Sequence, residues 1–399
     1  MSLYSAYCRT YQAVMRLAVR FLNWNGPQLL TGPGCVRELP QRIKSQGISK
    51  VLVVTDKVLM GLHLPEPLLQ GLEAAGVSYV LYDETKPNPS IDNIEAARTL
   101  YLKEGCAGII AFGGGSPMDC AKITAARVVL PGKTVQKMRG QLKVTKKLPP
   151  FYAIPTTAGT GSEVTIAAVV SDPATHEKYP INDPHLRPRC AVLDPELTVG
   201  LPPQITSTTG MDALTHAVEA YIGRSNTKDT AEKAVEATKM IFRHLETAYA
   251  DGKNLAAREG MLLASHYAGI AFTRAYVGYV HAIAHNLGGL YNIPHGLANA
   301  IILPYVLDYY GAAAWPRLAR LAEAVGIAGD SDEAKAKAFI AEIRAMNARM
   351  AIPDNIPQIQ EQDIDTIASR ALREGNPLYP VPKLMNREDC VGVIRELMG

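Results

Sequence analysis

Between about residue 50 and residue 195, the sequence alternates short apolar runs with amphipathic segments. This pattern is typical of β-α-β units, in which buried parallel strands are joined by helices. Parallel strands with helical crossovers are covered on both faces, so we expect a doubly wound, Rossmann-like α/β domain with a parallel sheet. The expected strands are 51–55, 78–82, 107–112 and 151–154, and the expected helices are 65–75, 91–103 and 117–129.

The periodicity changes after a proline-rich stretch, residues 194–203, which interrupts regular structure and marks a domain boundary. Beyond this stretch, apolar residues recur at helical spacing almost throughout, while residues 353–379 are turn-rich and are expected to be looser. We therefore predict an α/β domain over 1–199 and an all-helical domain over 200–399. The expected helices are 211–223, 228–250, 255–274, 279–291, 297–309, 315–325 and 331–349.

Composition limits the partners of this 399-residue chain. The net charge is only +3 and no basic block stands out, so nucleic acid is not an expected partner. A membrane span is not expected either, because no apolar run reaches about 18 residues. The six cysteines are scattered without a C-x-x-C pair, which favours free thiols in the cytoplasm. Small-molecule chemistry is the expectation.

The N-terminal stretch has two interpretations. Arg9, Arg16 and Arg20 lie in an amphipathic segment, and the first acidic residue is Glu38. Such a segment can be a transit peptide. It can also be a surface helix that covers the first domain, and this second interpretation is favoured.

A glycine-rich loop, Gly113-Gly-Gly-Ser-Pro-Met-Asp119, stands between an expected strand and an expected helix. We expect Ser116 to cap the helix, with Asp119 completing a capping box. Exposed amides and the helix dipole then suit a pyrophosphate. Met118 stands where the third glycine of G-x-G-x-x-G would be, so a purely structural turn is the alternative.

A second loop and a carboxylate support the nucleotide interpretation. The loop Pro155-Thr-Thr-Ala-Gly-Thr-Gly-Ser-Glu163 follows another expected strand and offers hydroxyls and bare amides to phosphate. Asp56 ends the first strand, where its carboxylate can accept from ribose hydroxyls and would repel a 2′-phosphate. This favours NAD over NADP, although a helix cap is an alternative role for Asp56.

The second half carries a pattern typical of a metal site. Asp212 and His216 are four residues apart, as are His281 and His285, and His295 follows a proline. Residues four apart share a helix face and can aim at one point. A carboxylate with imidazoles suits iron(II), zinc, cobalt or manganese, and these residue types do not choose among the four metals. Such a metal acidifies a bound hydroxyl, so a nicotinamide beside it would make an alcohol dehydrogenase. Four other histidines are interpreted as ordinary core or surface residues: His63, His176, His185 and His244.

Four motifs together resemble the iron-containing, group III alcohol dehydrogenase family. They are the glycine-rich run extended to Lys122, the threonine loop 155–163, Gly210-Met-Asp-Ala-Leu-Thr-His-Ala217, and Gly278-Tyr-Val-His-Ala-Ile-Ala-His-Asn-Leu-Gly-Gly289 with Pro294-His-Gly296. The resemblance extends over about residues 27–399. It implies an N-terminal dinucleotide-binding domain and a helical metal-binding domain, with a homodimer or larger homo-oligomer as the expected assembly.

The resemblance also implies roles for individual residues. Asp212, His216, His281 and His295 would hold Fe²⁺, or Zn²⁺ as a substitute, whereas His285 would lie near the nicotinamide and relay a proton. Asp119 would hold the glycine loop rather than contact NAD. The implied cofactor contacts are Asp56, Asn88, Gly114, Gly115, Ser116, Thr156, Thr157, Thr160 and Lys178.

Phe272 matches a substrate-pocket position, and Arg274 departs from the family pattern. The guanidinium of Arg274 can reach an anionic group on substrate or cofactor, or it can belong to a surface ion pair. The expected function is the NAD-linked interconversion of a small alcohol and its aldehyde or ketone. The alternatives are a metal-dependent hydrolase or lyase, a polyol-phosphate dehydrogenase of the same two-domain plan, and a scaffold without activity.

Overall fold

The computed structural model describes residues 3–19, 24–175 and 177–399, so Arg20 and His176 lie outside the described residues. The described residues form two compact units. Residues 24–200 make up the α/β unit, whereas residues 3–19 and 201–399 together make up the helical unit.

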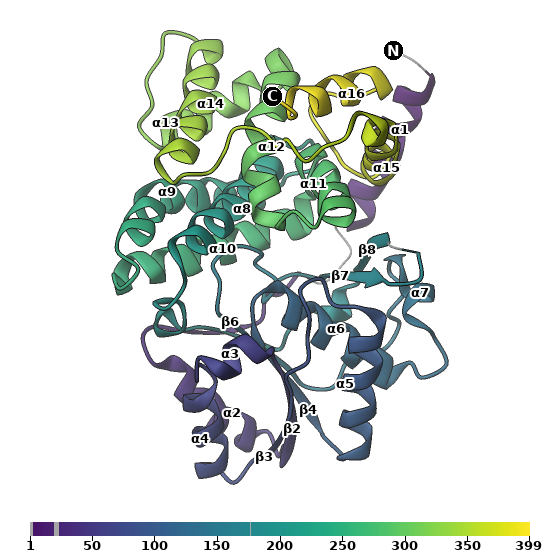
Figure 1. Cartoon of the computed structure of the whole chain (residues 1–399), viewed down its shortest axis with the longest axis vertical. Coiled ribbons are helices and arrows are strands. Elements are labelled where there is room, and N and C mark those ends of the chain that lie inside the picture. Colours follow the sequence, from purple (N-terminus) through teal and green to yellow (C-terminus); the bar gives the residue numbers. More distant parts are fainter. Residues whose placement is uncertain (1–2, 20–23, 176) are drawn as a thin grey trace. The chain divides into compact units, whose positions relative to one another are not determined.

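A six-stranded parallel sheet forms the centre of the α/β unit (Figure 1), in the order β1-β9-β6-β4-β2-β3. The four strands expected from the sequence are present within one residue at each end. The two others, β1 and β9, have only four residues each, which is too short to show a pattern. The strands are β1 (Gln28–Thr31), β2 (Lys50–Val54), β3 (Ser78–Tyr82), β4 (Gly108–Gly113), β6 (Phe151–Pro155) and β9 (Cys190–Leu193).

The strand order places the two ligand loops next to each other. From β2 the chain moves to β3 on one side, and then to β4 and β6 on the other. The direction of progress therefore reverses between β2 and β4, and ligands of open α/β sheets bind outside the carboxyl ends of the strands at such a reversal. Asp56 follows β2 and the glycine-rich loop follows β4, so both lie at this point.

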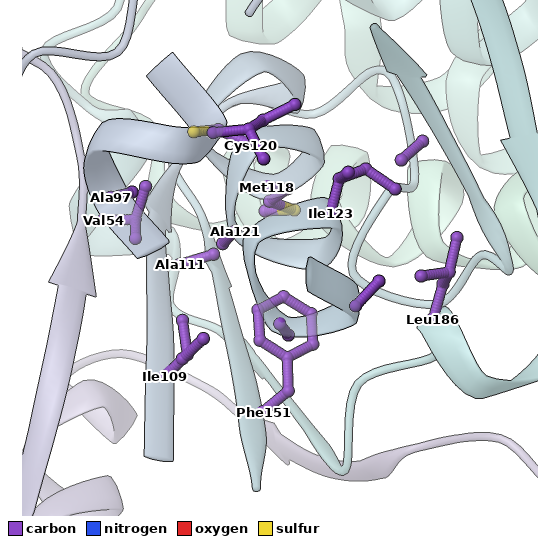
Figure 2. Close-up of a cluster of buried hydrophobic side chains, with 14 of the residues drawn as sticks. Val54, Ala97, Ile109, Ala111, Met118, Cys120, Ala121, Ile123, Phe151 and Leu186 are labelled. Atoms are coloured by element: carbon purple, nitrogen blue, oxygen red, sulfur yellow. The ribbon is translucent and has the colours of Figure 1, made fainter. Parts of the chain in front are cut away.

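Each face of the sheet is buried under helices. Leu52 and Val54 join a cluster formed with α5 (Ile91–Lys103) and α6 (Gly115–Val129), whereas Val51 and Val53 join a cluster formed with α2 (Leu39–Ser45) and α4 (Glu66–Ala74). Figure 2 shows part of the first cluster, in which Phe151 and other side chains of the sheet lie against α6. Burying a side chain of this size contributes roughly 1.5–3 kcal/mol. This burial fixes the strand ends that carry the loops.

The helices of the α/β unit include all those expected from the sequence. A small second sheet, in the order β5-β8-β7, was not expected from the sequence; β5 has only two residues and β8 contains Pro180. Its strands are β5 (Gly140–Gln141), β7 (Ala167–Asp172) and β8 (Glu177–Asn182). The helices are α2 (Leu39–Ser45), α3 (Lys57–Gly61), α4 (Glu66–Ala74), α5 (Ile91–Lys103), α6 (Gly115–Val129) and α7 (Val135–Met138).

The helical unit contains every helix expected after the proline-rich stretch. The expectation of a loose segment over 353–379 is wrong in part, because α15 forms there and buries Ile364, Ile367 and Ala371 at helical spacing. The helices are α8 (Pro203–Ile222), α9 (Lys228–Ala250), α10 (Leu255–Ala275), α11 (Tyr279–Tyr291), α12 (His295–Tyr310), α13 (Trp315–Ala324), α14 (Asp332–Arg349), α15 (Ile364–Gly375) and α16 (Arg387–Glu396).

The N-terminal helix α1 (Leu3–Ala18) belongs to the helical unit. Its Arg9 guanidinium donates to the carbonyls of Val381 and Pro382, at 2.8 and 3.1 Å. Gln12 is buried, and its Nε2 donates to the carbonyls of Pro377 and Tyr379. The expectation that this segment covers the first domain is therefore wrong, because its polar side chains find their partners near the other end of the sequence.

In the part of the chain that the structure describes, no helix is both long and apolar enough to cross a membrane. The six cysteines are free, as expected, and all six are buried.

Candidate functional site

The proposed metal ligands come from three helices of the helical unit. Asp212 and His216 are one turn apart on α8, His281 lies in the first turn of α11, and His295 is the first residue of α12. Helix α12 begins two residues earlier than expected, directly after Pro294 at its N-cap position. Ligand atoms of three of the residues, Asp212, His216 and His281, lie within 4.8 Å of one another, and all three side chains are buried.

Distances from Asp212 Oδ1 define the centre of the cluster. This oxygen lies 3.6 Å from His295 Nε2, 3.7 Å from His281 Nε2 and 4.0 Å from His216 Nδ1. Four ligands around a metal at about 2.1 Å would be separated by roughly 3.4 Å, so the observed spacing fits one divalent ion. His281 Nε2 is buried without a hydrogen-bond partner among the described residues, as expected for an atom reserved for a ligand.

The charges of the cluster also suit a cation. Burial alone would raise the pKa of Asp212, but the charges of His216 and His295 and the contacts of His281 hold it well below its ordinary value. Burial would lower the pKa of His281, but the nearby carboxylates of Asp212 and Glu219 raise it to about 9. Two buried carboxylates therefore demand positive charge at this point, which a divalent ion supplies.

Glu219 is a functional residue that the sequence interpretation missed. Its Oε2 accepts from His281 Nδ1 at 2.6 Å and from the Gly278 amide at 2.8 Å, and its Oε1 accepts from the Val280 amide at 2.9 Å. A carboxylate on Nδ1 leaves Nε2 as the ligating atom and fixes the ring. One signal was available, because Glu219 follows His216 by three residues and therefore lies on the same face of α8.

Asn299 is a second missed residue. It lies one turn after His295 on α12, and its Nδ2 donates to Asp212 Oδ1 at 2.7 Å. This contact orients the carboxylate toward the histidines. Nothing in the sequence singles out Asn299, since its partner is 87 residues away.

His285 lies at the edge of the cluster rather than in its centre. Its ring stacks on His295 with centroids 5.2 Å apart, and its Nδ1 is 2.7 Å from Glu374 Oε1. Glu374 was not identified from the sequence either, since it lies 89 residues away on α15. The arrangement leaves His285 with an oriented ring beside a proposed ligand.

The two pocket residues differ in their surroundings. The ring of Phe272 stacks on His216, with centroids 4.1 Å apart, which places an apolar wall beside the metal ligands. Arg274 contacts Asp229 at 2.5 Å, the ion pair that the sequence left open as an alternative. Among the histidines interpreted as ordinary, His63 and His185 pair with Glu66 and Asp183.

In the α/β unit, the glycine-rich and threonine-rich loops meet closely. A Cβ on Gly114 would lie 3.2 Å from Thr157 Oγ1, and one on Gly115 would lie 3.0 Å from Thr160 Cγ2. Side chains at these two positions would crowd Thr157 and Thr160. The amide of Thr156 donates to the Gly113 carbonyl, which ties the ends of β4 and β6 together.

Two expectations about the start of α6 are wrong. The N-cap is Gly114 rather than Ser116, whose hydroxyl instead accepts from the amide of Asn88 at 3.2 Å. Asp119 does not hold the glycine loop, because its carboxylate accepts from Ser162 Oγ and the Val169 amide and so holds the threonine loop. Burial raises the pKa of Asp119 to about 6.

Lys122 reinforces that loop. It is fully buried, and its Nζ donates to the hydroxyls of Ser162 and Thr165 and to the carbonyls of Thr165 and Ala167. Burial lowers the pKa of this amine to about 8. The glycine-rich motif includes this lysine, but the sequence alone gives it no role, because its acceptors are about 40 residues further along the chain.

The other proposed cofactor residues occupy separate positions. Asp56 caps α3, and its Oδ1 accepts from the Leu59 amide at 2.9 Å. Its Oδ2 has no contact of this kind in the described structure. Lys178 lies on β8 of the small sheet, where burial lowers its pKa to about 8.

The two units match a known family. Residues 26–195 match the family model "iron-containing alcohol dehydrogenase", and residues 206–398 match "Fe-containing alcohol dehydrogenase family, C-terminal". The chain is 38% identical to 1,3-propanediol dehydrogenase of Klebsiella pneumoniae over 371 residues, which cover 92% of this chain and 95% of the relative. It is 35% identical to NAD-dependent methanol dehydrogenase of Bacillus methanolicus, over 93% of this chain and 98% of that protein.

A solved structure of 1,3-propanediol oxidoreductase superimposes with a TM-score of 0.91 at 37% identity, and the match covers 94% of this chain and 100% of that one. The α/β unit, the helical unit with its Asp and His cluster, and these matches agree. This chain belongs to the iron-containing alcohol dehydrogenase family of oxidoreductases.

Proposed function

We propose that this protein is an NAD-linked, metal-dependent dehydrogenase that interconverts a small alcohol and its aldehyde or ketone. One observation carries the proposal: Asp212, His216 and His281 are buried with their ligand atoms within 4.8 Å of one another. His295 completes the set. Iron(II) is the expected ion and zinc the substitute, and either would polarise the substrate oxygen as a Lewis acid.

The residues around the cluster have complementary tasks. Glu219 fixes the ring of His281, and Phe272 presents an apolar wall that suits a short carbon chain. His285, with its Nδ1 engaged by Glu374, has its other nitrogen available to take up or return the proton of the substrate hydroxyl. Since Arg274 is engaged by Asp229, we propose no charged group on the substrate.

In the α/β unit, the glycine and threonine loops would hold NAD, which accepts or returns hydride at its nicotinamide. The amides that precede α6 suit the pyrophosphate, and Asp56 suits the ribose. A relative named as NAD-dependent supports this choice of cofactor. A hydrolase or lyase is not supported, because the family is one of oxidoreductases.

His281→Ala tests the proposal. The variant should lose its bound metal and its turnover of short-chain aldehydes with NADH, because one ligand and the partner of Glu219 disappear together. NADH binding, followed by fluorescence, should persist, since the loops lie in the other unit. Chelation of the wild-type protein should reproduce the loss. Undiminished turnover by the metal-free protein would defeat the assignment.

A further inference from the structure

The N-terminal helix connects to His285 through a chain of hydrogen bonds. Gln12 Nε2 donates to the Tyr379 carbonyl at 2.8 Å, and the hydroxyl of Tyr379 donates to Glu374 Oε1 at 2.8 Å. The same oxygen of Glu374 lies 2.7 Å from Nδ1 of His285. Three contacts therefore join α1 to the proposed proton relay.

Arg9 fixes the end of this hydrogen-bond chain that lies on α1. Arg9 donates both to the Gln12 side-chain oxygen, at 2.9 Å, and to the Val381 carbonyl, so the amide of Gln12 has a fixed orientation. Gln12 and Tyr379 are each only 6% exposed, so water does not readily replace their contacts. The segment 376–382, which we call the strap, is thereby held against α1.

The strap is also braced against α11, the helix that carries His285. The hydroxyl of Tyr279 donates to Asn376 Oδ1 at 2.8 Å and accepts from the Met385 amide at 3.1 Å. The distance between Glu374 and His285 thus depends on how the strap is seated. Both family models begin their match at residue 26 or later, so α1 precedes the region that they describe.

We propose that Glu374 is the positioning residue of His285 and that α1 sets its geometry through Gln12 and Tyr379. This rests on the role proposed above for His285. A carboxylate that accepts from Nδ1 holds the imidazole in the tautomer whose Nε2 has a lone pair, and the Tyr379 hydroxyl keeps that carboxylate in place. Without Glu374, Tyr379 or Gln12, the imidazole ring of His285 is free to rotate or to change tautomer.

A double-mutant cycle in the full chain tests the coupling. Gln12→Ala should lower kcat by ~2- to 30-fold with little change in KM, the range expected for residues that act through others. Gln12→Glu keeps the size but replaces the donor by an acceptor, and should have a similar effect. In a His285→Ala background, the same changes to Gln12 should not lower kcat further, because the imidazole on which they act is gone. Arg16→Ala, on the exposed side of α1, is the control and should leave kcat unchanged.

A second readout does not depend on turnover. Nitrogen NMR of ¹⁵N-histidine-labelled, metal-free protein reports the tautomer of His285, with the signal assigned by its absence from His285→Ala. Wild-type protein should show the proton on Nδ1, and Glu374→Ala, Tyr379→Phe and Gln12→Ala should show a mixture of tautomers.

The possible failures are distinguishable. If His285→Ala turns over normally, the role proposed for His285 fails, while the tautomer measurement still decides whether α1 and Glu374 orient the ring. A second outcome would overturn the positioning inference and leave the proposed function standing. In it, His285→Ala has a lower kcat than wild type, Gln12→Ala lowers kcat by the same factor with and without His285→Ala, and the tautomer of His285 is unchanged in Gln12→Ala.

Discussion

At the scale of single residues, Glu219 connects metal binding to backbone geometry. Its carboxylate satisfies two amides at the start of α11 as well as the Nδ1 atom of His281. Such amides have no partner within the helix and favour negative charge. Gly278 permits this approach, because a Cβ there would lie 2.6 Å from Glu219 Oε1.

Glu219→Gln should therefore weaken metal binding by ~10- to 100-fold, the usual cost of removing an outer partner of a ligating histidine. The amide keeps the shape but removes the charge that orients His281. Competition with a chromogenic chelator measures the affinity. Glu388→Gln, at an exposed position of α16, is the matched control. Equal affinities of wild type and Glu219→Gln would contradict the role.

Lys178 gives a prediction about pH. Its pKa in the folded protein is about 8, lowered by burial from 10.5, so the unfolded state binds more protons between pH 8 and 10.5. Burial of the charged amine therefore destabilises the folded state. This contribution is fully present below pH 8 and disappears as the pH rises from 8 to 10.5. The free energy of unfolding of wild type should rise relative to that of Lys178→Met over pH 8–10.5.

Denaturant titrations at a series of pH values measure that difference, and effects common to both proteins cancel. Lys137→Met, at an exposed position, is the control and should show a constant difference from wild type. A difference between wild type and Lys178→Met that does not change with pH would mean that the lysine is solvated.

Residue spacing made the proposed metal ligands visible, because residues four apart on a helix share a face. Their partners were not visible in the same way. Glu374 and Asn299 are 89 and 87 residues from the groups that they contact, and only the packing of the helices brings them together. Ser116 was assigned as a cap because its type suits that position, but the helix begins two residues earlier than expected and the hydroxyl accepts from Asn88 instead.

At the scale of elements, the close contact of α12 with α8 sets the distance between His295 and Asp212. Gly296 permits it, since a Cβ at this position would lie 2.5 Å from the Thr208 carbonyl oxygen. A backbone atom cannot move aside as the end of a side chain can.

Gly296→Ala should therefore separate the two helices. We expect it to destabilise the protein by about 1–3 kcal/mol despite the better helix propensity of alanine, and to weaken metal binding. Gly289→Ala is the matched control, because that glycine lies in α11 and a Cβ there would have nothing within 4 Å. Urea unfolding and metal titration compare the two variants, and a Gly296→Ala protein as stable as Gly289→Ala would refute the packing argument.

The long helices and the buried strands were predictable from the sequence because their periods repeat over several turns or over a continuous apolar run. The element α15 shows where this approach failed. Its apolar spacing was readable, but it lies between turn-rich segments and was assigned with them. Strands β1 and β9 are recognisable only by their pairing in the sheet, as Leu29 with Ala191 and Tyr152 with Cys190.

At the scale of the whole molecule, the two proposed cofactors belong to different units. Metal should stabilise the helical unit and NADH the α/β unit, each by about 2.7 kcal/mol at 100 times its dissociation constant. Hydrogen exchange with mass spectrometry should show added zinc slowing exchange mainly in 201–399 and NADH mainly in 24–200. Asp212→Ala should remove the first effect and keep the second. Protection of the α/β unit by zinc in that variant would speak against the assignment.

The membership of α1 in the helical unit has a consequence for synthesis of the chain. Gln12 and its acceptor in Tyr379 are 367 residues apart, so the ribosome makes the helix long before its docking site exists. At about 5–20 residues per second, α1 waits on the order of 20–70 s. The α/β unit is made entirely within that interval and can complete its core first. The helical unit then closes around a helix that was made before the α/β unit.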